Sequence, residues 1–209
     1  MISERYVIWM SKKKMTSCIL ILPGRDQTGI ELAKQWSNTF LDSTAIVLIT
    51  PTNREWYPMP NGVLDQKEAI SGLEPAKKVI NGVIKRINSE LKIPNHRIAI
   101  AGFSAGGVMA NYVCASSNDE YAACVCHSGA ILEPEKVPKC KFKKMPFVLT
   151  HSYDDDAFDW EERYIPMKNS LIKNEYNLQC LESRFGHHVY DEEIDFSASA
   201  ICKRLGYNI

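Results

Sequence analysis

The sequence predicts an α/β domain with a mostly parallel β-sheet and helices on both of its faces. From about residue 16 to the end, short apolar runs alternate with segments of helical periodicity, a pattern typical of parallel strands joined by helices. Most of the runs are continuously apolar, as expected for strands that are buried on both faces. A chain of 209 residues is long enough for one domain with a sizeable core. We therefore predict a single domain over residues 1–209, with no insertion long enough to form a large lid.

Seven segments are predicted to be strands. Residues 5–10 alternate weakly between apolar and polar side chains and resemble an edge strand. The run T-S-C-I-L-I-L at residues 16–22 ends at Pro23-Gly24 and indicates a buried strand. The other predicted strands are residues 44–50, 97–102, 121–128, 145–151 and 178–183.

Five segments are predicted to be helices: residues 29–41, 66–91, 108–115, 160–173 and 190–205. The second contains Gly72 and Pro75, and it is predicted to break there because an interior proline removes a helical hydrogen bond. The last begins with Asp191, Glu192 and Glu193, and acidic residues favour a helix N-terminus. A loop with three prolines, residues 51–65, precedes the second helix.

Composition narrows the classes of function and partner. The 25 basic and 25 acidic side chains give a formal net charge of zero, which argues against nucleic acid or an anionic membrane as the main partner. No run of 18 apolar residues is present, and the charges near the N-terminus lie on the wrong side of a short apolar run for a signal peptide. The seven cysteines lie mostly in apolar segments, which is typical of reduced thiols in a cytoplasmic protein. Cys124-x-Cys126 has no second matching pair, so we expect no metal and no other cofactor.

The sequence G-F-S-A-G at residues 102–106 matches the nucleophile-elbow pattern G-x-S-x-G. In this pattern a sharp turn between a strand and a helix exposes one serine at the edge of the sheet, in a strained backbone conformation. An apolar strand pattern precedes the motif and a helical pattern follows it. Gly102 and Gly106 are expected to let the strand and the helix approach closely. The alternative interpretation is a glycine-rich turn in which Ser104 has no chemical role.

A serine hydroxyl needs a neighbouring base, and that base needs an orienting acid. Because functional groups of parallel sheets gather at the carboxyl ends of the strands, we predict His187, after the last strand, as the base. Its neighbour His188 is the alternative, whereas His96 and His127 are expected to be structural and His151 to hold the acid loop. The order of serine, aspartate and histidine along the chain is that of an α/β-hydrolase.

The acid is less well determined, because four aspartates lie close together after the strand at residues 145–151. These are Asp154, Asp155, Asp156 and Asp159. The reaction also needs hydrogen-bond donors for the oxyanion. We predict the backbone N–H groups of Ala105, directly after the serine, and of Arg25, in the loop after the strand at residues 16–22.

These residues together resemble the phospholipase/carboxylesterase family of α/β-hydrolases, which includes acyl-protein thioesterases. The family carries an elbow like G-F-S-Q-G-G, which is G-F-S-A-G-G here. The family's H-G-x-x-D segment resembles residues 151–155, and this register implies Asp155 as the acid. Its G-H-x-V segment resembles residues 186–189 and implies His187. The W-Y-P segment of some bacterial members resembles residues 56–58 and implies that Trp56 lies near the substrate.

The sequence departs from the family at three places. The family's L-H-G-x-G-D is L-P-G-R-D-Q at residues 22–27, the elbow has alanine for glutamine, and the acid motif has serine for glycine. A backbone N–H donor at residue 25 does not depend on the side chain, so these changes do not exclude the family's type of reaction. The charged Arg25 side chain would favour an acidic or polar leaving group.

The resemblance implies a serine hydrolase that cleaves a carboxylic ester or thioester bond, in a small molecule or an acylated substrate, through an acyl-enzyme. We expect this hydrolase to be a monomer or a homodimer. Its active-site residues would be Ser104, Asp155 and His187, with Arg25 and Ala105 at the oxyanion and Trp56 at the substrate. One alternative is an inactive relative that binds a ligand or a partner in the same pocket, as the altered loop at residues 22–27 would suggest. Another is a peptidase or acyl transferase on the same fold.

Overall fold

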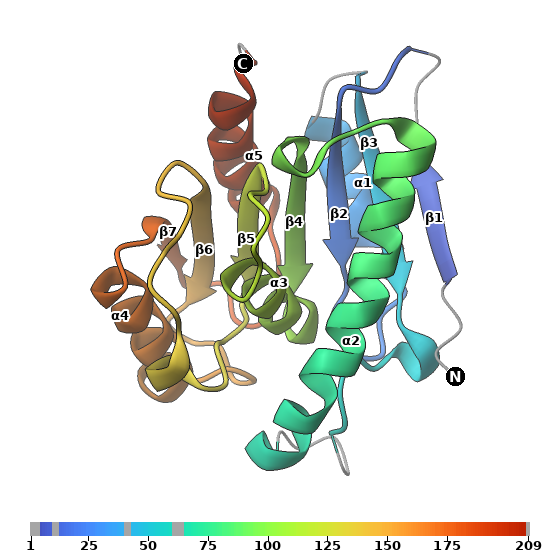
Figure 1. Ribbon diagram of the computed structural model, residues 1–209. Helices are drawn as coiled ribbons and strands as arrows, with labels where there is room; N and C mark the ends of the chain where they lie inside the picture. Colours follow the sequence, from blue (N-terminus) through green and yellow to red (C-terminus); the bar gives the residue numbers. More distant parts are fainter. Residues whose placement is uncertain (1–4, 10–12, 40–42, 60–64, 208–209) are drawn as a thin grey trace.

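The computed structural model describes residues 5–9, 13–39, 43–59 and 65–207. Seven strands form one sheet in the order β1-β3-β2-β4-β5-β6-β7 (Figure 1). Strand β1 pairs antiparallel with β3, and the other six strands run parallel. The strands are β1 Arg5–Trp9, β2 Ser17–Leu22, β3 Thr44–Thr50, β4 Ile98–Phe103, β5 Ala123–His127, β6 Pro146–Ser152 and β7 Asn177–Ser183. The predicted mostly parallel sheet is confirmed, and the predicted edge strand is present as β1. Its antiparallel pairing with β3 was not predicted.

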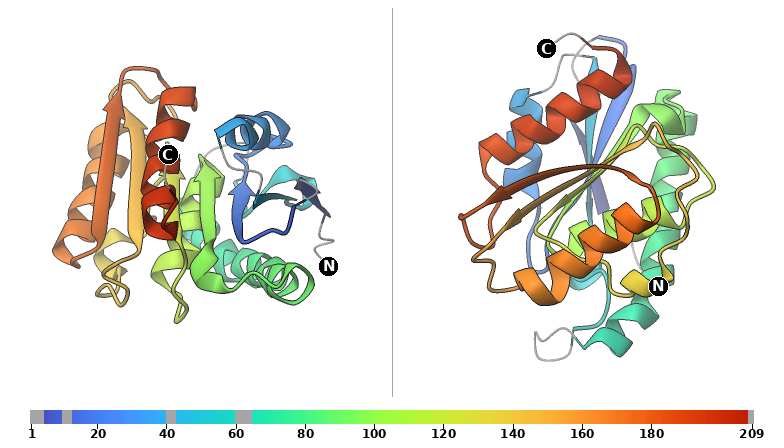
Figure 2. Two further views of the ribbon diagram at one scale, coloured as in Figure 1. Left: turned by 90° about the horizontal axis from the view of Figure 1, so that it is seen from above. Right: turned by 90° about the vertical axis from the view of Figure 1, so that its left-hand side faces the viewer.

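Helices cover both faces of the sheet, which is why the central strands are apolar on both sides. Helices α1 and α5 lie on one face, and α2, α3 and α4 lie on the other (Figure 2). Their bounds are α1 Ile30–Thr39, α2 Gln66–Arg86, α3 Ala105–Ala115, α4 Ile165–Lys173 and α5 Asp191–Leu205. Every predicted helix is present, although α4 is preceded by a π-helical turn at Trp160–Tyr164. Met10 and Leu41, at the ends of two predicted elements, lie outside the described residues.

The predicted break in the second helix is wrong. Helix α2 continues through Gly72 and Pro75, and a π-helical turn at Ile87–Leu91 follows it. An interior proline costs about 3 kcal/mol relative to alanine, but burying one large aliphatic side chain contributes about 1.5–3 kcal/mol. Ile80, Val83 and Ile84 are all buried on the same face of α2. Packing of that face against the sheet therefore outweighs the local effect of Pro75.

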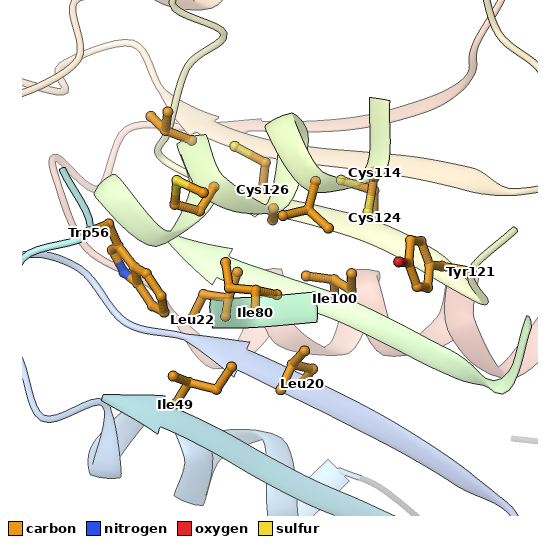
Figure 3. Close-up of a cluster of buried hydrophobic side chains, with 14 of the residues drawn as sticks. Leu20, Leu22, Ile49, Trp56, Ile80, Ile100, Cys114, Tyr121, Cys124 and Cys126 are labelled. Atoms are coloured by element: carbon orange, nitrogen blue, oxygen red, sulfur yellow. The ribbon is translucent and has the colours of Figure 1, made fainter. Parts of the chain in front are cut away.

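The larger of the two cores lies between the sheet and α2, α3 and α4. Figure 3 shows this core, in which Leu20, Leu22 and Ile100 of the sheet meet Ile80 of α2. Trp56 lies at one end, beside the end of β2. All seven cysteines are free thiols, and six of them are buried. Within the described residues, no helix combines the length and the apolar character needed to cross a membrane.

Parallel strands bring their carboxyl ends to the same edge of the sheet. Ser104 follows β4, Asp155 follows β6, and His187 follows β7. The segment 23–27 follows β2, which pairs directly with β4. The fold therefore gathers the predicted site residues at one edge of the sheet.

Candidate active site

Ser104 lies in a tight turn between β4 and α3. Its backbone has φ 55° and ψ −121°, a conformation that residues with a side chain rarely adopt. Such strain costs on the order of 1–3 kcal/mol and persists because neighbouring contacts hold it. The Ser104 N–H donates to the His127 carbonyl at 2.9 Å, and the Ser104 carbonyl accepts from Val108 N–H at 3.1 Å. The predicted strained elbow is thus present.

The two glycines of the motif allow the strand and the helix to meet. A Cβ atom on Gly102 would lie 2.1 Å from the carbonyl oxygen of Gly106. A Cβ atom on Gly106 would lie 2.0 Å from the carbonyl oxygen of Leu22, at the end of β2. Both obstacles are backbone atoms, which a side-chain rotation cannot remove. The predicted close approach is confirmed, and it also brings the start of α3 against the loop that follows β2.

Ser104, His187 and Asp155 are hydrogen-bonded in series. Ser104 Oγ lies 2.9 Å from His187 Nε2. His187 Nδ1 lies 2.9 Å from each carboxylate oxygen of Asp155. The imidazole therefore contacts the hydroxyl with one nitrogen and the carboxylate with the other, which is the arrangement that base activation of a serine requires.

Among the four clustered aspartates, Asp155 is the one that faces His187. It is buried, whereas Asp154, Asp156 and Asp159 are exposed. Its Oδ1 accepts from the N–H groups of Ala157 at 2.9 Å and Phe158 at 2.8 Å. Burial alone would raise the pKa of Asp155, but the hydrogen bonds from His187 and Phe158 outweigh it and lower the pKa below the ordinary value. Asp155 is therefore ionised at neutral pH.

Ser152, the serine that replaces a glycine of the family motif, holds the histidine loop. Its Oγ accepts hydrogen bonds from the N–H groups of Phe185 and Gly186, both at 2.9 Å. Gly186 adopts φ 68°, a left-handed conformation that suits glycine. The segment that carries His187 is thus anchored to the end of β6, next to Asp155. The pattern alone did not indicate this role, although the departure from the family motif marked the position.

The other histidines lie outside the Ser104–His187–Asp155 series. His127 is fully buried, its Nδ1 lies 2.7 Å from Thr150 Oγ1, and burial lowers its pKa to about 3. His151 Nε2 lies 2.8 Å from the Phe158 carbonyl, so His151 holds the acid loop as predicted. His96 and His188 are exposed. The structure brings His187, rather than His188, to Ser104.

The two predicted oxyanion donors lie on either side of the junction between β2 and α3. Ala105 begins α3, and the first hydrogen bond of the helix ladder is donated by Val108, so the Ala105 N–H is left without an intrahelical acceptor. Within the described residues, the Arg25 N–H makes no hydrogen bond. The Arg25 guanidinium lies 3.5 Å from the carboxylate of Asp26. Both backbone donors are therefore available to a ligand.

The segment 23–27 is held by contacts with the loop after β3, which begins with a 3-10 turn at Thr52–Arg54. The indole Nε1 of Trp56 donates to the Pro23 carbonyl at 2.8 Å. The Asp26 N–H donates to the Arg54 carbonyl at 3.0 Å. Within the segment, the Gly24 N–H donates to Gln27 Oε1 at 3.3 Å. We call residues 23–27, which carry the predicted donor at Arg25, the oxyanion loop.

Trp56 is 6% exposed and belongs to the larger core, so most of its surface contacts the protein itself. Contact between Trp56 and substrate stays a prediction. The hydrogen bond from Trp56 to Pro23 shows that its indole lies beside the oxyanion loop.

Phe103 was missed by sequence reasoning. Its ring centroid lies 4.8 Å from that of His187, and it is buried directly before Ser104.

Comparison with known proteins identifies the family and the fold. Residues 8–203 match the profile of the phospholipase/carboxylesterase family. The chain is 29% identical, over 156 residues, to acyl-protein thioesterase 1 homolog 1 of Dictyostelium discoideum, covering 72% of this chain and 67% of that protein. The crystal structure of esterase PE8 superposes with a TM-score of 0.84 at 20% identity, covering 96% and 98% of the two chains. The Bacillus cereus carboxylesterase superposes with a TM-score of 0.79 at 14% identity, covering 96% and 94%.

Proposed function

The chain belongs to the phospholipase/carboxylesterase family, and we propose that it is a serine hydrolase in which Ser104, His187 and Asp155 form a catalytic triad. Its substrates would be small molecules or acylated groups that carry a carboxylic ester or thioester bond. The observation that carries this proposal is the unbroken hydrogen-bonded series from the Ser104 hydroxyl to the Asp155 carboxylate. Support also comes from the relatives described above as acyl-protein thioesterase and carboxylesterase.

In the first half of the reaction, Ser104 Oγ attacks the carbonyl carbon and transfers its proton to His187 Nε2. The carbonyl oxygen becomes an oxyanion that accepts hydrogen bonds from the N–H groups of Arg25 and Ala105. One such donor contributes about 2.7–4 kcal/mol to transition-state stabilisation. The tetrahedral intermediate then collapses, the bond to the alcohol or thiol breaks, and the leaving oxygen or sulfur takes the proton from Nε2. An acyl-enzyme on Ser104 remains.

In the second half, water attacks the acyl carbon and gives a proton to His187 Nε2. The bond to Ser104 Oγ breaks, Oγ recovers the proton from the imidazole, and the carboxylic acid leaves. Asp155 keeps the imidazole oriented and stabilises the imidazolium in both halves. The depressed pKa of Asp155 supports this role because it keeps the carboxylate charged.

We further propose that residues 1–209 act as one domain, as a monomer or homodimer in the cytoplasm. All the strands of the described residues belong to a single sheet, which supports one domain. Six buried free thiols support a reducing compartment. Sedimentation would test the oligomeric state, and localisation of a tagged chain would test the compartment.

The proposed function is tested with Ser104→Ala. We expect the wild type to hydrolyse p-nitrophenyl butyrate and butyryl thioesters and to be labelled stoichiometrically by a fluorophosphonate, and we expect Ser104→Ala to lose both properties. Ser116→Ala is the matched control, because Ser116 is an exposed serine at the other end of the same helix. If the folded wild type neither turns over esters nor reacts with the fluorophosphonate, the chain is a binding protein rather than a hydrolase.

A further inference from the structure

A cavity of about 730 Å³ opens between the start of α1 and the loop after β7. Its walls come from segment 27–35, from Phe103 and from segment 188–191. We call it the α1 cavity. It falls in the size range of small-molecule sites, about 300–1,000 Å³. None of the residues of the proposed triad lines this cavity, so its role has to be considered separately from that of the triad.

Two wall residues of the α1 cavity, Phe103 and His188, are neighbours of His187. Phe103 directly precedes Ser104, and its ring packs against the His187 ring. Phe103 Cδ1 also lies 3.2 Å from the position that a Cβ atom on Gly24 would occupy. His188, a further wall residue, directly follows His187. The cavity is thus bounded by the immediate chain neighbours of the nucleophile and the base, and by the end of the oxyanion loop.

A leaving group must be close to His187, because its oxygen or sulfur takes the proton from Nε2. The part of the substrate beyond that atom has to extend away from Ser104. The α1 cavity offers space for it beside the histidine. On the basis of the proposed hydrolase function, we infer that the α1 cavity binds the alcohol or thiol portion of the substrate.

The walls of the α1 cavity select for a polar leaving group. Seven of the eleven residues that line it are polar or charged. Gln27 uses its side-chain oxygen to accept from Gly24 N–H, which leaves its amide hydrogens free to donate. The Thr28 hydroxyl accepts at most a long hydrogen bond, 3.5 Å from Ile30 N–H, and its own hydrogen is free to donate. These groups match hydroxyl oxygens on a ligand.

The α1 cavity is preformed, and its wall residues carry a slightly negative net charge. Gln35 Nε2 donates to the Val189 carbonyl at 3.3 Å and to Asp191 Oδ1 at 3.2 Å, which ties α1 to the start of α5. Lys34 pairs with Glu31 at 3.0 Å. The charged wall residues Glu31, Lys34 and Asp191 therefore carry a net charge of minus one. An uncharged, hydroxyl-rich alcohol fits this surface, whereas an anionic leaving group is disfavoured. This differs from the expectation that Arg25 would favour an acidic leaving group, because the Arg25 guanidinium pairs with Asp26 and does not line the cavity.

Esters that share one acyl group and differ in the alcohol test the inference. The set is 2,3-dihydroxypropyl, propyl and 2-carboxyethyl butyrate, with each kcat/KM divided by the rate of alkaline hydrolysis of the same ester. One to two extra hydrogen bonds are expected to favour the dihydroxypropyl ester over the propyl ester by about tenfold. The carboxyethyl ester is expected to be the slowest of the three.

Variants connect this preference to the cavity. Thr28→Val removes a hydroxyl at nearly constant volume, and Thr28→Ser keeps it. Glu31→Trp places a large side chain in the cavity from an exposed position. Thr28→Val and Glu31→Trp are expected to reduce the dihydroxypropyl preference at least threefold, and Thr28→Ser to retain it. Glu161→Trp, an exposed position on the π-helical turn before α4, is the control. Fluorophosphonate labelling shows that each variant is folded and competent.

The outcomes separate the two proposals. A preference that falls with Thr28→Val and Glu31→Trp but not with Glu161→Trp supports the leaving-group site. Hydrolysis of all three esters at similar normalised rates, or a preference that neither cavity variant changes, overturns the leaving-group site and leaves the hydrolase function intact. Failure of the wild type to hydrolyse any ester or to react with the fluorophosphonate refutes the hydrolase function, and the leaving-group site with it.

Discussion

Replacing Trp56 by phenylalanine tests how the oxyanion loop is held. The substitution keeps most of the buried aromatic surface but removes the indole N–H that donates to the Pro23 carbonyl at 2.8 Å. Pro23 is buried, so its carbonyl loses a donor that water does not readily replace. The net loss is about 1–3 kcal/mol, the range for a buried polar group that loses its partner.

Loss of the hydrogen bond from Trp56 weakens the interactions that hold residues 23–27 in their conformation. The remaining contacts to that segment include the bond from Asp26 N–H to the Arg54 carbonyl and the long bond within the loop, from Gly24 N–H to Gln27 Oε1. If the donor at Arg25 were lost entirely, the barrier would rise by about 2.7–4 kcal/mol. A loosened loop retains part of that stabilisation. We therefore expect kcat to fall by about tenfold, with KM changing less than twofold, since about 1.4 kcal/mol corresponds to a factor of ten.

Steady-state kinetics on p-nitrophenyl esters of increasing acyl length give the required separation of kcat from KM. A trifluoromethyl ketone, which forms an oxyanion adduct with a serine, should bind more weakly to Trp56→Phe by a similar factor. Trp36→Phe is the control, because Trp36 is a fully buried tryptophan of α1. An unchanged kcat with a KM that rises with acyl length would refute this reasoning. That result would show instead that Trp56 contacts substrate, as the resemblance implies.

Three further predictions concern the acid, the elbow and a buried histidine. Asp155→Asn should fold but lose about three to four orders of magnitude in kcat, because the amide favours the wrong tautomer of His187; a loss below tenfold, with the fold verified by circular dichroism, would contradict the role of Asp155. Gly106→Ala should fail to yield folded protein, or lose more than about 4 kcal/mol of stability, since its Cβ atom would lie 2.0 Å from the Leu22 carbonyl oxygen; a wild-type melting temperature would show that the junction can move. His127 has a folded-state pKa near 3 against an ordinary value of 6.5, so the unfolded chain binds a proton that the folded protein does not, and stability falls as the pH drops below 6.5. Between pH 6.5 and pH 5 this loss is about 1.6 kcal/mol, which urea unfolding at the two pH values measures. His127→Gln should show a smaller loss, and an equal loss in both proteins would assign the acid sensitivity to other groups.

The sequence was sufficient to predict which strand ends bring the candidate site residues together. Ser104 and His187 follow from the order of strands and from the motif, because parallel strands must bring their carboxyl ends together. The choice of Asp155 among its neighbours depended on the family register. Its burial and its two backbone donors became visible in three dimensions.

Other features depend on tertiary packing and could not be predicted. A proline in the sequence indicates that continuing a helix there is locally unfavourable. The burial of Ile80 and Ile84, which outweighs this cost, depends on how α2 packs against the sheet. The direction of the Trp56 indole depends on the path of its loop. The hydroxyl of Ser152 bridges to Phe185 and Gly186 because β6 and β7 are neighbours, a pairing that the order of strands along the chain does not specify.

The contact between Gly106 and Leu22 has a consequence for redesign. Backbone packs directly on backbone there, so the separation between the start of α3 and the oxyanion loop is set by main-chain dimensions. Side-chain substitutions cannot adjust this distance in small steps; they either leave it unchanged or disrupt it. Attempts to change the substrate range should therefore keep the β2–α3 junction intact and vary the exposed positions at Thr28, Glu31 and Lys34. Gln27 belongs to both the oxyanion loop and the wall of the α1 cavity, so redesign of the cavity should leave Gln27 unchanged as well.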